Sequence, residues 1–215
     1  MKLTQLVRTL SLFTVALALT ACSKPLGERM GEALSVVRGF QNSDHAIPTL
    51  VFENAKGIAI LREDSGALII GGAGGEGIFM KRAGLSWSAP VAVNTGSASI
   101  GLQAGGQSRD IIIVMNTDNE VSNFLDSGLY GLAEASAVAG PAKTDPYNAG
   151  GPVPATYYYI RSKGLFGGLL VGGVHFSISD KVNHETYGDS ATIGDILRDK
   201  YPAPAGASVL WQSLN

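Results

Sequence analysis

The chain has 215 residues, of which 45% are hydrophobic and 16% are charged, and its formal charge at pH 7 is −2. This apolar content is enough to form one sizeable core, which argues against intrinsic disorder. The small acidic excess argues against a protein that binds nucleic acid through a basic surface.

The N-terminal stretch has the pattern of a secretory signal. Lys2 and Arg8 supply its positive charge, and the apolar run at residues 12–19 is shorter than the roughly 20 residues of a membrane-spanning helix. We therefore predict a signal peptide at residues 1–21. Its removal would lower the formal charge of the chain to about −4.

Residues 19–22, Leu-Thr-Ala-Cys, resemble the lipobox of bacterial lipoproteins, in which cleavage after Ala21 leaves an acylated cysteine as the first residue. Cys22 is the only cysteine, so internal disulfides are excluded. Several acyl chains anchor a protein stably, because each buried methylene contributes about 0.8 kcal/mol. The resemblance implies a protein of the bacterial cell envelope, and Ser23 in place of aspartate implies the periplasmic face of the outer membrane. A plain signal peptide with a chance cysteine is the alternative.

The first elements after the signal are predicted to be helices. Residues 26–40 carry apolar side chains at helical spacing, at Met30, Ala33, Leu34 and Val37, which predicts one amphipathic helix. A short second helix is predicted at residues 47–54, because proline is favourable at a first helical position.

From Gly57 onward, short apolar runs alternate with turn residues, which predicts antiparallel strands. The runs are residues 58–61, 67–70, 78–80, 87–93 and 111–115. Residues 63–66 and 81–84 have the composition of turns, and such short links favour hairpins over crossover helices. The later predicted elements are a helix at 116–125, a long loop at 139–154, strands at 155–161 and 165–177, a helix at 193–200 capped by Thr192, and a helix at 205–214.

These elements predict an α+β fold. Its centre is a glycine-rich, largely antiparallel β-sheet, or a partly closed barrel, with N-terminal and C-terminal helices. The predicted organisation is a signal at residues 1–21, a short tether at 22–29 and a single domain at 30–215. Glycine lets a strand curve sharply or approach another backbone, since it has no Cβ. The glycines predicted to have this structural role are Gly71, Gly72, Gly74, Gly75, Gly77, Gly105, Gly106, Gly167 and Gly168.

Three kinds of catalytic or cofactor site are disfavoured. Residues 72–77 match the dinucleotide fingerprint G-x-G-x-x-G, but the residues after them indicate a strand and a turn, not the helix that would face a pyrophosphate. The histidines do not have zinc-ligand spacing, so no metal or cofactor is predicted. Residues 84–88 lack the last glycine of a nucleophile elbow. We therefore predict that the protein is not an enzyme, and a hydrolase is only the third hypothesis.

Two short segments near residue 160 are candidate binding surfaces. The three tyrosines at 157–159 would alternate along a strand, so packing in the core explains them better than a stacking platform does. Arg161 and Lys163 lie beside Leu165 and Phe166 in a predicted turn. Two cations beside apolar side chains suit an anionic lipid surface, although ordinary solvated turn charge explains each residue as well.

Several motifs then occur in one order along the chain. They are residues 55–60, 71–77, 87–90, 100–107, 139–141 and 162–168, Asn183 with 187–188, and residues 195–197. Together they resemble the SYLF family of lipid-binding domains, also described as the actin-binding domain of certain fungal endocytic proteins. The resemblance runs from about residue 30 to residue 214. It implies a compact α+β domain that binds membrane lipids, with phosphoinositides and other acidic lipids as ligands of eukaryotic members, and it implies no catalysis.

For this chain the resemblance implies a lipoprotein member of the family whose domain binds acidic or phosphorylated lipids. The candidate lipid-binding residues are Lys56, Arg82, Arg161, Lys163, Leu165 and Phe166. The expected partners are a membrane through the acyl anchor, anionic lipid headgroups and an envelope protein, with no nucleic acid. The acidic charge of the mature chain keeps a second hypothesis open, in which the domain recognises another protein and the lipid is only a tether.

Overall fold

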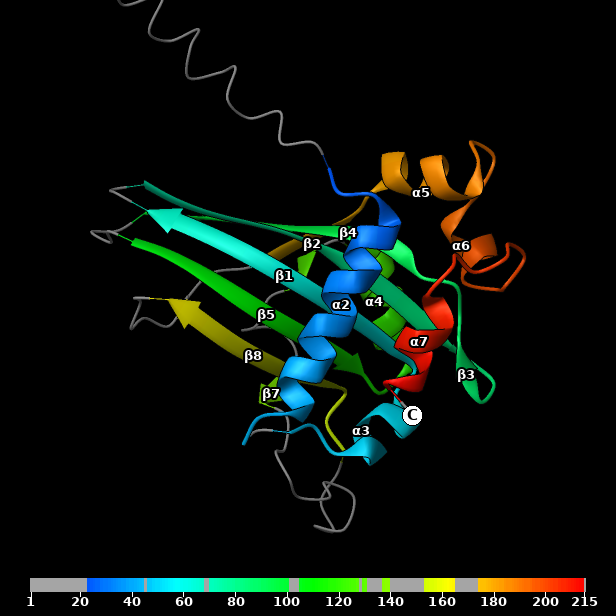
Figure 1. Cartoon of the computed structure of the whole chain (residues 1–215), viewed down its shortest axis with the longest axis horizontal. Coiled ribbons are helices and arrows are strands. Elements are labelled where there is room, and N and C mark those ends of the chain that lie inside the picture. Colours follow the sequence, from blue (N-terminus) through cyan, green and yellow to red (C-terminus); the bar gives the residue numbers. More distant parts are fainter. Residues whose placement is uncertain are drawn as a thin grey trace, which may run out of the picture.

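A computed structural model describes residues 23–44, 46–67, 70–100, 105–127, 129–130, 137–139, 153–164 and 174–214. Its centre is a nine-stranded sheet with the order β6-β9-β4-β2-β1-β5-β8-β7, and β3 pairs with β2 outside this path (Figure 1). The strands are β1 Gly57–Ala67, β2 Ile70–Ala83, β3 Ser86–Trp87, β4 Val91–Ile100, β5 Gly105–Met115, β6 Leu129–Tyr130, β7 Ala137–Ala139, β8 Thr156–Gly164 and β9 Val174–Ile178.

Every strand pair is antiparallel except β7 with β8. The described strands at the two ends of the order, β6 and β7, do not pair with each other, so the sheet is open. This confirms the predicted α+β class and the antiparallel sheet, in preference to the barrel.

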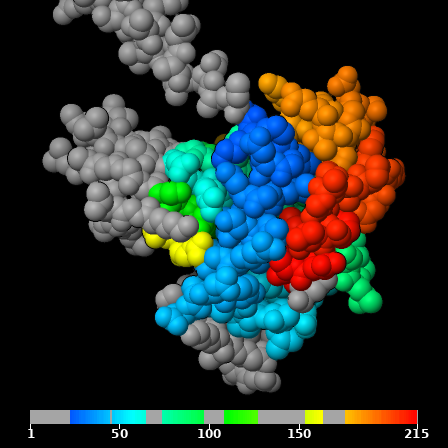
Figure 2. All heavy atoms as spheres, in the orientation of Figure 1, coloured from blue at the N-terminus to red at the C-terminus, as the bar shows by residue number. Residues whose placement is uncertain are grey.

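The helices cover one half of the sheet on both faces. They are α2 Leu26–Gln41, α3 Thr49–Asn54, α4 Asp118–Ser127, α5 Asp180–Tyr187, α6 Ile193–Ile196 and α7 Ala207–Gln212. Helices α2, α3 and α7 pack on one face, and α4 and α6 pack on the other. Figure 2 shows α2 and the C-terminal α7 side by side on the same face. None of the described helices combines the length and the apolar character that crossing a membrane requires.

Alternation along each strand divides the apolar side chains between two cores. Ile58 and Ile60 of β1 face α2, whereas Ala59 and Leu61 face the opposite layer. The three tyrosines at 157–159 follow the same rule, because the first and third belong to the α2 core and the middle one to the other core. Packing in the core therefore explains them, as predicted.

Two predicted turns are wrong, because the strands continue through them. Residues 63–66 belong to β1, which pairs with β2 and β5 as far as Ala67. Residues 81–83 belong to β2, and the reversal is the two-residue link Gly84-Leu85. A two-residue hairpin favours glycine at a positive φ, and the φ of Gly84 is +61°.

The sheet extends beyond its helices. In Figure 1, β1, β5 and β8 continue to one side of α2, where no described helix covers them. The apolar rows end near Leu61, and the strands then continue with polar residues and glycine. Local composition indicates turns here because these side chains resemble turn residues, whereas pairing with both neighbours keeps the backbone extended.

The remaining elements agree in part with the predictions. Helices α2, α3, α4 and α7 lie where the sequence predicts them, within three residues at each end. Thr192 caps α6, since its hydroxyl accepts a hydrogen bond from the Asp195 backbone N–H at 3.2 Å, but α6 ends at Ile196. The predicted strand at 87–93 is two strands, with Pro90 between them. Arg161 and Lys163 lie in β8, not in a turn. Residues 140–152 of the predicted long loop lie outside the described residues.

Helix α5, which the sequence did not predict, is fixed to β4 by one buried side chain. The Asn183 side chain accepts a hydrogen bond from the Ala92 N–H at 2.7 Å and donates one to the Ala92 carbonyl at 3.2 Å. The Tyr187 hydroxyl also donates to the Pro90 carbonyl at 2.6 Å. The Ala92 carbonyl also accepts a hydrogen bond from the Ser179 backbone N–H at 2.9 Å, so the Ala92 N–H is the backbone group that depends on Asn183.

We therefore expect Asn183→Ala to lower the free energy of unfolding by about 2 kcal/mol, because the buried Ala92 N–H loses its acceptor, while the Ala92 carbonyl keeps the Ser179 N–H as a donor. Glu185→Ala on the same helix is the matched control. Its carboxylate is exposed and lies 3.9 Å from Lys181, so its loss should change stability by less than about 1 kcal/mol. Urea denaturation of the two variants measures the difference, and equal midpoints would contradict the expectation.

Candidate functional site

A row of polar residues crosses the sheet where the apolar core ends. Asn94, Glu76, Arg62, Asp110 and Arg161 are successive Cα partners on β4, β2, β1, β5 and β8. Directly opposed residues of antiparallel strands share one face, so these five side chains lie on the same face. Helix α2 crosses above this row and contacts both of its ends.

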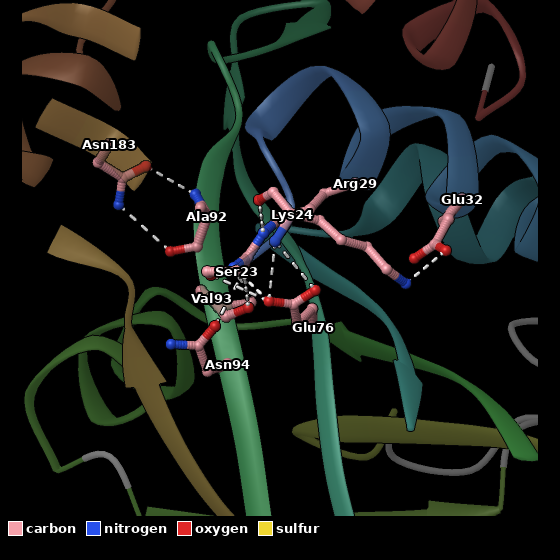
Figure 3. Close-up of polar contacts among 9 residues, drawn as sticks. All are labelled: Ser23, Lys24, Arg29, Glu32, Glu76, Ala92, Val93, Asn94 and Asn183. Carbon is pink, nitrogen blue, oxygen red and sulfur yellow. Dashed lines mark hydrogen bonds and ion pairs between the residues drawn. The ribbon is translucent and has the colours of Figure 1, made fainter. Parts of the chain in front are cut away.

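At one end of the row, a buried arginine connects α2 to the sheet (Figure 3). The side chain of Arg29 is 0% exposed, and burial without partners would be costly for a permanent charge. A guanidinium has five N–H donors. The acceptors of Arg29 are the Lys24 carbonyl at 2.8 Å, the Val93 carbonyl at 2.7 Å, Asn94 Oδ1 at 3.0 Å, Ser23 Oγ at 2.6 Å and Glu76 Oε1 at 2.9 Å.

The same cluster holds the first described residues of the chain. Ser23 Oγ donates to Glu76 Oε1 at 3.0 Å, and the Lys24 backbone N–H donates to the same atom at 3.2 Å. Lys24 Nζ also forms an ion pair with Glu32 of α2 at 2.6 Å. Figure 3 shows these groups converging between α2 and the strands β2 and β4. We call Ser23, Lys24, Arg29 and Glu76 the N-terminal clamp.

Burial lowers the pKa of Arg29 from its ordinary value, and the charges of Glu76 and Glu32 oppose that effect. Arginine stays protonated in proteins, so the clamp is held by a full positive charge at neutral pH. No residue of the clamp was among the predicted site residues. A charge at position 29, on the apolar face of the predicted helix, was the one local signal that could have indicated it.

At the other end of the row, Asp110 lies between two arginines. Its side chain is 1% exposed and accepts hydrogen bonds from Arg62 Nε at 2.9 Å and from Arg161 Nη2. The Arg161 guanidinium also lies against Gly39 and 5.3 Å from the Phe40 ring at the end of α2. Arg161, a candidate lipid-binding residue, therefore stabilises the contact between α2 and the sheet.

Asp110 makes the stability of the domain depend on pH. Burial alone raises the pKa of Asp110, but hydrogen bonds and charge from Arg161 and Arg62 outweigh that effect, so the pKa lies below its ordinary value of 3.8. A carboxylate with a lowered pKa stabilises the folded state above the pKa of the unfolded chain, and this stabilisation is lost as the pH falls.

We expect Asp110→Asn to lower the free energy of unfolding by about 2 kcal/mol at pH 7, because two arginines lose a charged acceptor. The difference between the two proteins should begin to shrink below about pH 4, where the unfolded chain starts to bind the proton, and it should be lost as the pH falls through the lowered pKa of the folded state. Urea midpoints at pH 7 and pH 3 measure this. The same difference at both pH values would show that the charge of Asp110 contributes nothing.

Lys56 and Arg82 lie together at the far end of the sheet. Lys56 is exposed, and its carbonyl accepts a hydrogen bond from the Arg82 N–H at 2.8 Å. The Arg82 side chain donates to the Phe52 and Ala55 carbonyls at the end of α3, and its guanidinium lies 3.9 Å from the centroid of the Trp87 ring. Arg82 thus caps a helix, whereas the Lys56 side chain points to solvent.

The candidate lipid-binding residues do not form one site. Lys163 pairs with Ser108, which pairs with Asp64, seven residues along β1 from the end that holds Lys56. Lys56 directly precedes Gly57, so at about 3.3 Å per residue the two lysines are roughly 25 Å apart along the sheet. Leu165 and Phe166 lie outside the described residues, as does Cys22.

The predicted structural glycines also have different surroundings. Gly71, Gly72, Gly74, Gly75 and Gly77 lie in β2, Gly105 and Gly106 begin β5, and Gly167 and Gly168 lie outside the described residues. A Cβ on Gly75 or Gly77 would meet the β1 backbone, whereas a Cβ on Gly74 would have its nearest neighbour at 4.0 Å. The fingerprint at 72–77 lies within β2, so it does not begin a helix.

The opposite face of the sheet carries a second buried ion pair. Glu63, which is 0% exposed, accepts hydrogen bonds from Arg109 Nη2 and, at 3.4 Å, from Thr95 Oγ1. Within the described ranges, no group of three or more histidine, cysteine, aspartate or glutamate side chains is arranged to hold a metal ion. The described polar clusters connect elements of the fold.

Comparison with known proteins identifies the family. The Ysc84 family, described as "Las17-binding protein actin regulator", matches residues 96–215. Protein YSC84 of Saccharomyces cerevisiae is 30% identical over 195 residues, which cover 85% of this chain and 42% of the relative. LAS seventeen-binding protein 3 of the same yeast is 31% identical over 178 residues, which cover 80% of this chain and 39% of the relative.

A human relative, SH3 domain-containing YSC84-like protein 1, is 31% identical over 179 residues, which cover 80% of this chain and 52% of the relative. This chain therefore spans about half or less of the length of these relatives. No solved structure matches it significantly. Because the family match covers more than half of the sequence, the chain belongs to the Ysc84 family, also known as the SYLF domain family.

Proposed function

We propose that this protein is a lipoprotein of the bacterial cell envelope, acylated at Cys22 on the periplasmic face of the outer membrane, whose SYLF domain binds acidic or phosphorylated lipids of the phosphatidylinositol type. Family membership supports the lipid-binding domain, and the lipobox supports the anchor. The observation that carries the proposal is the N-terminal clamp. Since Ser23 is bonded to the domain, acylation at the preceding residue brings the domain itself to the bilayer surface.

Lys56 and Lys163 are the residues proposed to contact the lipid. Lys56 is exposed, whereas the guanidinium groups of Arg82 and Arg161 are engaged in bonds within the domain. Lys163 is the next-to-last residue of β8, and in the sequence it stands two residues before Leu165. A lysine near an anionic surface contributes about 1 kcal/mol, and the adjacent apolar residues would insert shallowly into the bilayer.

Flotation of the non-acylated domain with liposomes tests the lipid binding. We expect the domain to float with anionic vesicles and not with neutral ones, and added salt should weaken the binding. Lys56→Gln with Lys163→Gln should reduce flotation, whereas the charge-matched pair Arg198→Gln with Lys200→Gln, two exposed cations away from α5, should not. If the domain floats with neither anionic nor neutral vesicles, the proposal is contradicted.

The anchor has its own test. The full-length chain, expressed in a bacterial host, should incorporate labelled palmitate and separate with the outer membrane, and Cys22→Ser should abolish both results. Palmitate incorporation by the Cys22→Ser variant, or its absence from the unchanged chain, would contradict acylation at this residue.

A protein partner is the second candidate function. The family description names Las17 binding and actin regulation, and most described lysines and arginines already have a carboxylate partner within 4.0 Å. Such pairing weakens general attraction to an anionic bilayer. Crosslinking in intact cells separates the two functions, since recovery of lipid without any protein partner would count against this one.

A further inference from the structure

The N-terminal clamp also bears on how the domain is oriented on a membrane. We propose that it fixes the orientation of the domain on the membrane, so that the start of α2 and the neighbouring α5 form the surface that faces the bilayer. This inference rests on the proposed acylation of Cys22. The partner of this surface is the bilayer that receives the protein's own acyl chains.

The first step is that almost no flexible chain separates the anchor from the domain. Ser23 and Lys24 are held by Glu76 and Arg29, and the next residue, Pro25, is the N-cap of α2. Proline has a fixed φ, and Cys22 is joined to Ser23 by a single peptide bond, so almost no chain separates an acyl group on Cys22 from the clamp. A lipidated Cys22 is therefore joined to a rigid part of the domain.

The second step is the strength of the clamp. Arg29 has an acceptor for each of its five N–H donors, drawn from the N-terminal segment, β2 and β4. Releasing Ser23 and Lys24 would leave donors of a fully buried guanidinium without partners, which is costly. The bound position of the segment is therefore strongly favoured over a free tether.

The third step identifies the surface beside the anchor. Arg29 binds the Val93 carbonyl, and the adjacent Ala92 is bound by Asn183 of α5. Figure 2 shows the start of α2 in contact with α5. On this helix the side chain of Lys181 is 77% exposed, so it is available to a bilayer beside the clamp.

The β2–β3 hairpin is expected to lie away from the bilayer. Leu85 at its tip is 98% exposed, which by composition alone would make it a candidate for insertion into a membrane. It lies beyond Ala83, and seven residues of β2 separate Ala83 from Glu76, or roughly 20 Å. Figure 1 shows this hairpin far from the start of α2. A fixed orientation therefore keeps Leu85 away from the anchoring bilayer, together with Lys56, whose carbonyl is bonded to the Arg82 N–H at the base of this hairpin. The lipid that Lys56 is proposed to contact would then belong to a second surface.

Photo-crosslinking of the full-length chain in a bacterial host tests the orientation. Benzoylphenylalanine replaces either Lys181 or Leu85, and crosslinks to radiolabelled phospholipid are counted. We expect a severalfold higher yield at position 181 than at position 85. The control inserts Ser-Gly-Ser-Gly between Cys22 and Ser23, which keeps serine after the cysteine and leaves the clamp intact while adding slack. In that variant the two yields should become similar.

Equal yields at the two positions without the insertion, or a ratio that the insertion does not change, would overturn the fixed orientation. Palmitate incorporation, measured on the same samples, separates this failure from that of the proposed function. If the protein carries palmitate and the two crosslinking yields are equal, only the fixed orientation is contradicted. If the protein carries no palmitate, both the anchor and the orientation are contradicted.

Discussion

Replacement of Gly77 by alanine is expected to lower the free energy of unfolding by at least about 3 kcal/mol, or to prevent folding. The added Cβ would meet the carbonyl oxygen of Ile60 and lie 2.8 Å from the Leu61 Cα. Both are backbone atoms of β1, a strand that is paired on both sides, so neither can move without distorting the ladder. At Gly39, by contrast, the added Cβ would meet the Arg161 side chain, which is flexible and could move aside.

Gly74→Ala is the matched control, because it makes the same chemical change in the same strand. Its nearest neighbour would be the Thr95 carbonyl oxygen at 4.0 Å, an ordinary contact. A loss of about 3 kcal/mol corresponds to a fall in Tm of roughly 6–12 °C for a domain of this size. Thermal unfolding by circular dichroism measures both variants. A fall for Gly77→Ala no larger than that for Gly74→Ala would contradict the close approach of β1 and β2.

The sequence could predict that these glycines serve the sheet, but not which of them is essential. Paired glycines at the ends of apolar runs indicate strands that approach another backbone. Whether a given Cβ would clash depends on the neighbouring strand at that position. Gly74 and Gly77 both pair with β1, but they are three residues apart, so a Cβ would point to opposite faces of β2, and only the structure shows that the one at Gly77 meets the β1 backbone.

Periodicity predicted the helices and cores well, since these depend on spacing within one segment. Met30, Ala33 and Val37 are all buried on α2, as the helical pattern indicates. The polar half of the sheet was missed, because its stability comes from partners distant in the sequence. Arg62 and Asp110 are 48 residues apart, and Arg29 and Glu76 are 47 apart. The position of Arg29 on the apolar face of α2 is a local signal of a buried charge, but nothing local identifies the partner of either arginine.

A different expectation concerns the buried ion pair on the opposite face of the sheet. Arg109→Met should lower the free energy of unfolding by about 3–5 kcal/mol, because it leaves the carboxylate of Glu63 buried without a countercharge. Glu63 is 0% exposed, and its remaining described partner is the Thr95 hydroxyl at 3.4 Å. Arg198→Met is the control, since its ion pair with Asp195 is largely exposed and should be worth less than about 1 kcal/mol.

A double replacement separates the loss of a contact from the penalty of an unpaired charge. In Glu63→Met with Arg109→Met no charge is left buried, and replacing a whole buried pair by apolar residues is often neutral. We therefore expect the double variant to be more stable than Arg109→Met alone, by at least about 2 kcal/mol. Urea denaturation at pH 7 measures the four proteins of the cycle. If the double variant is as unstable as the sum of the two single variants, the charges act independently and the pair does not hold β1 and β5 together at this position.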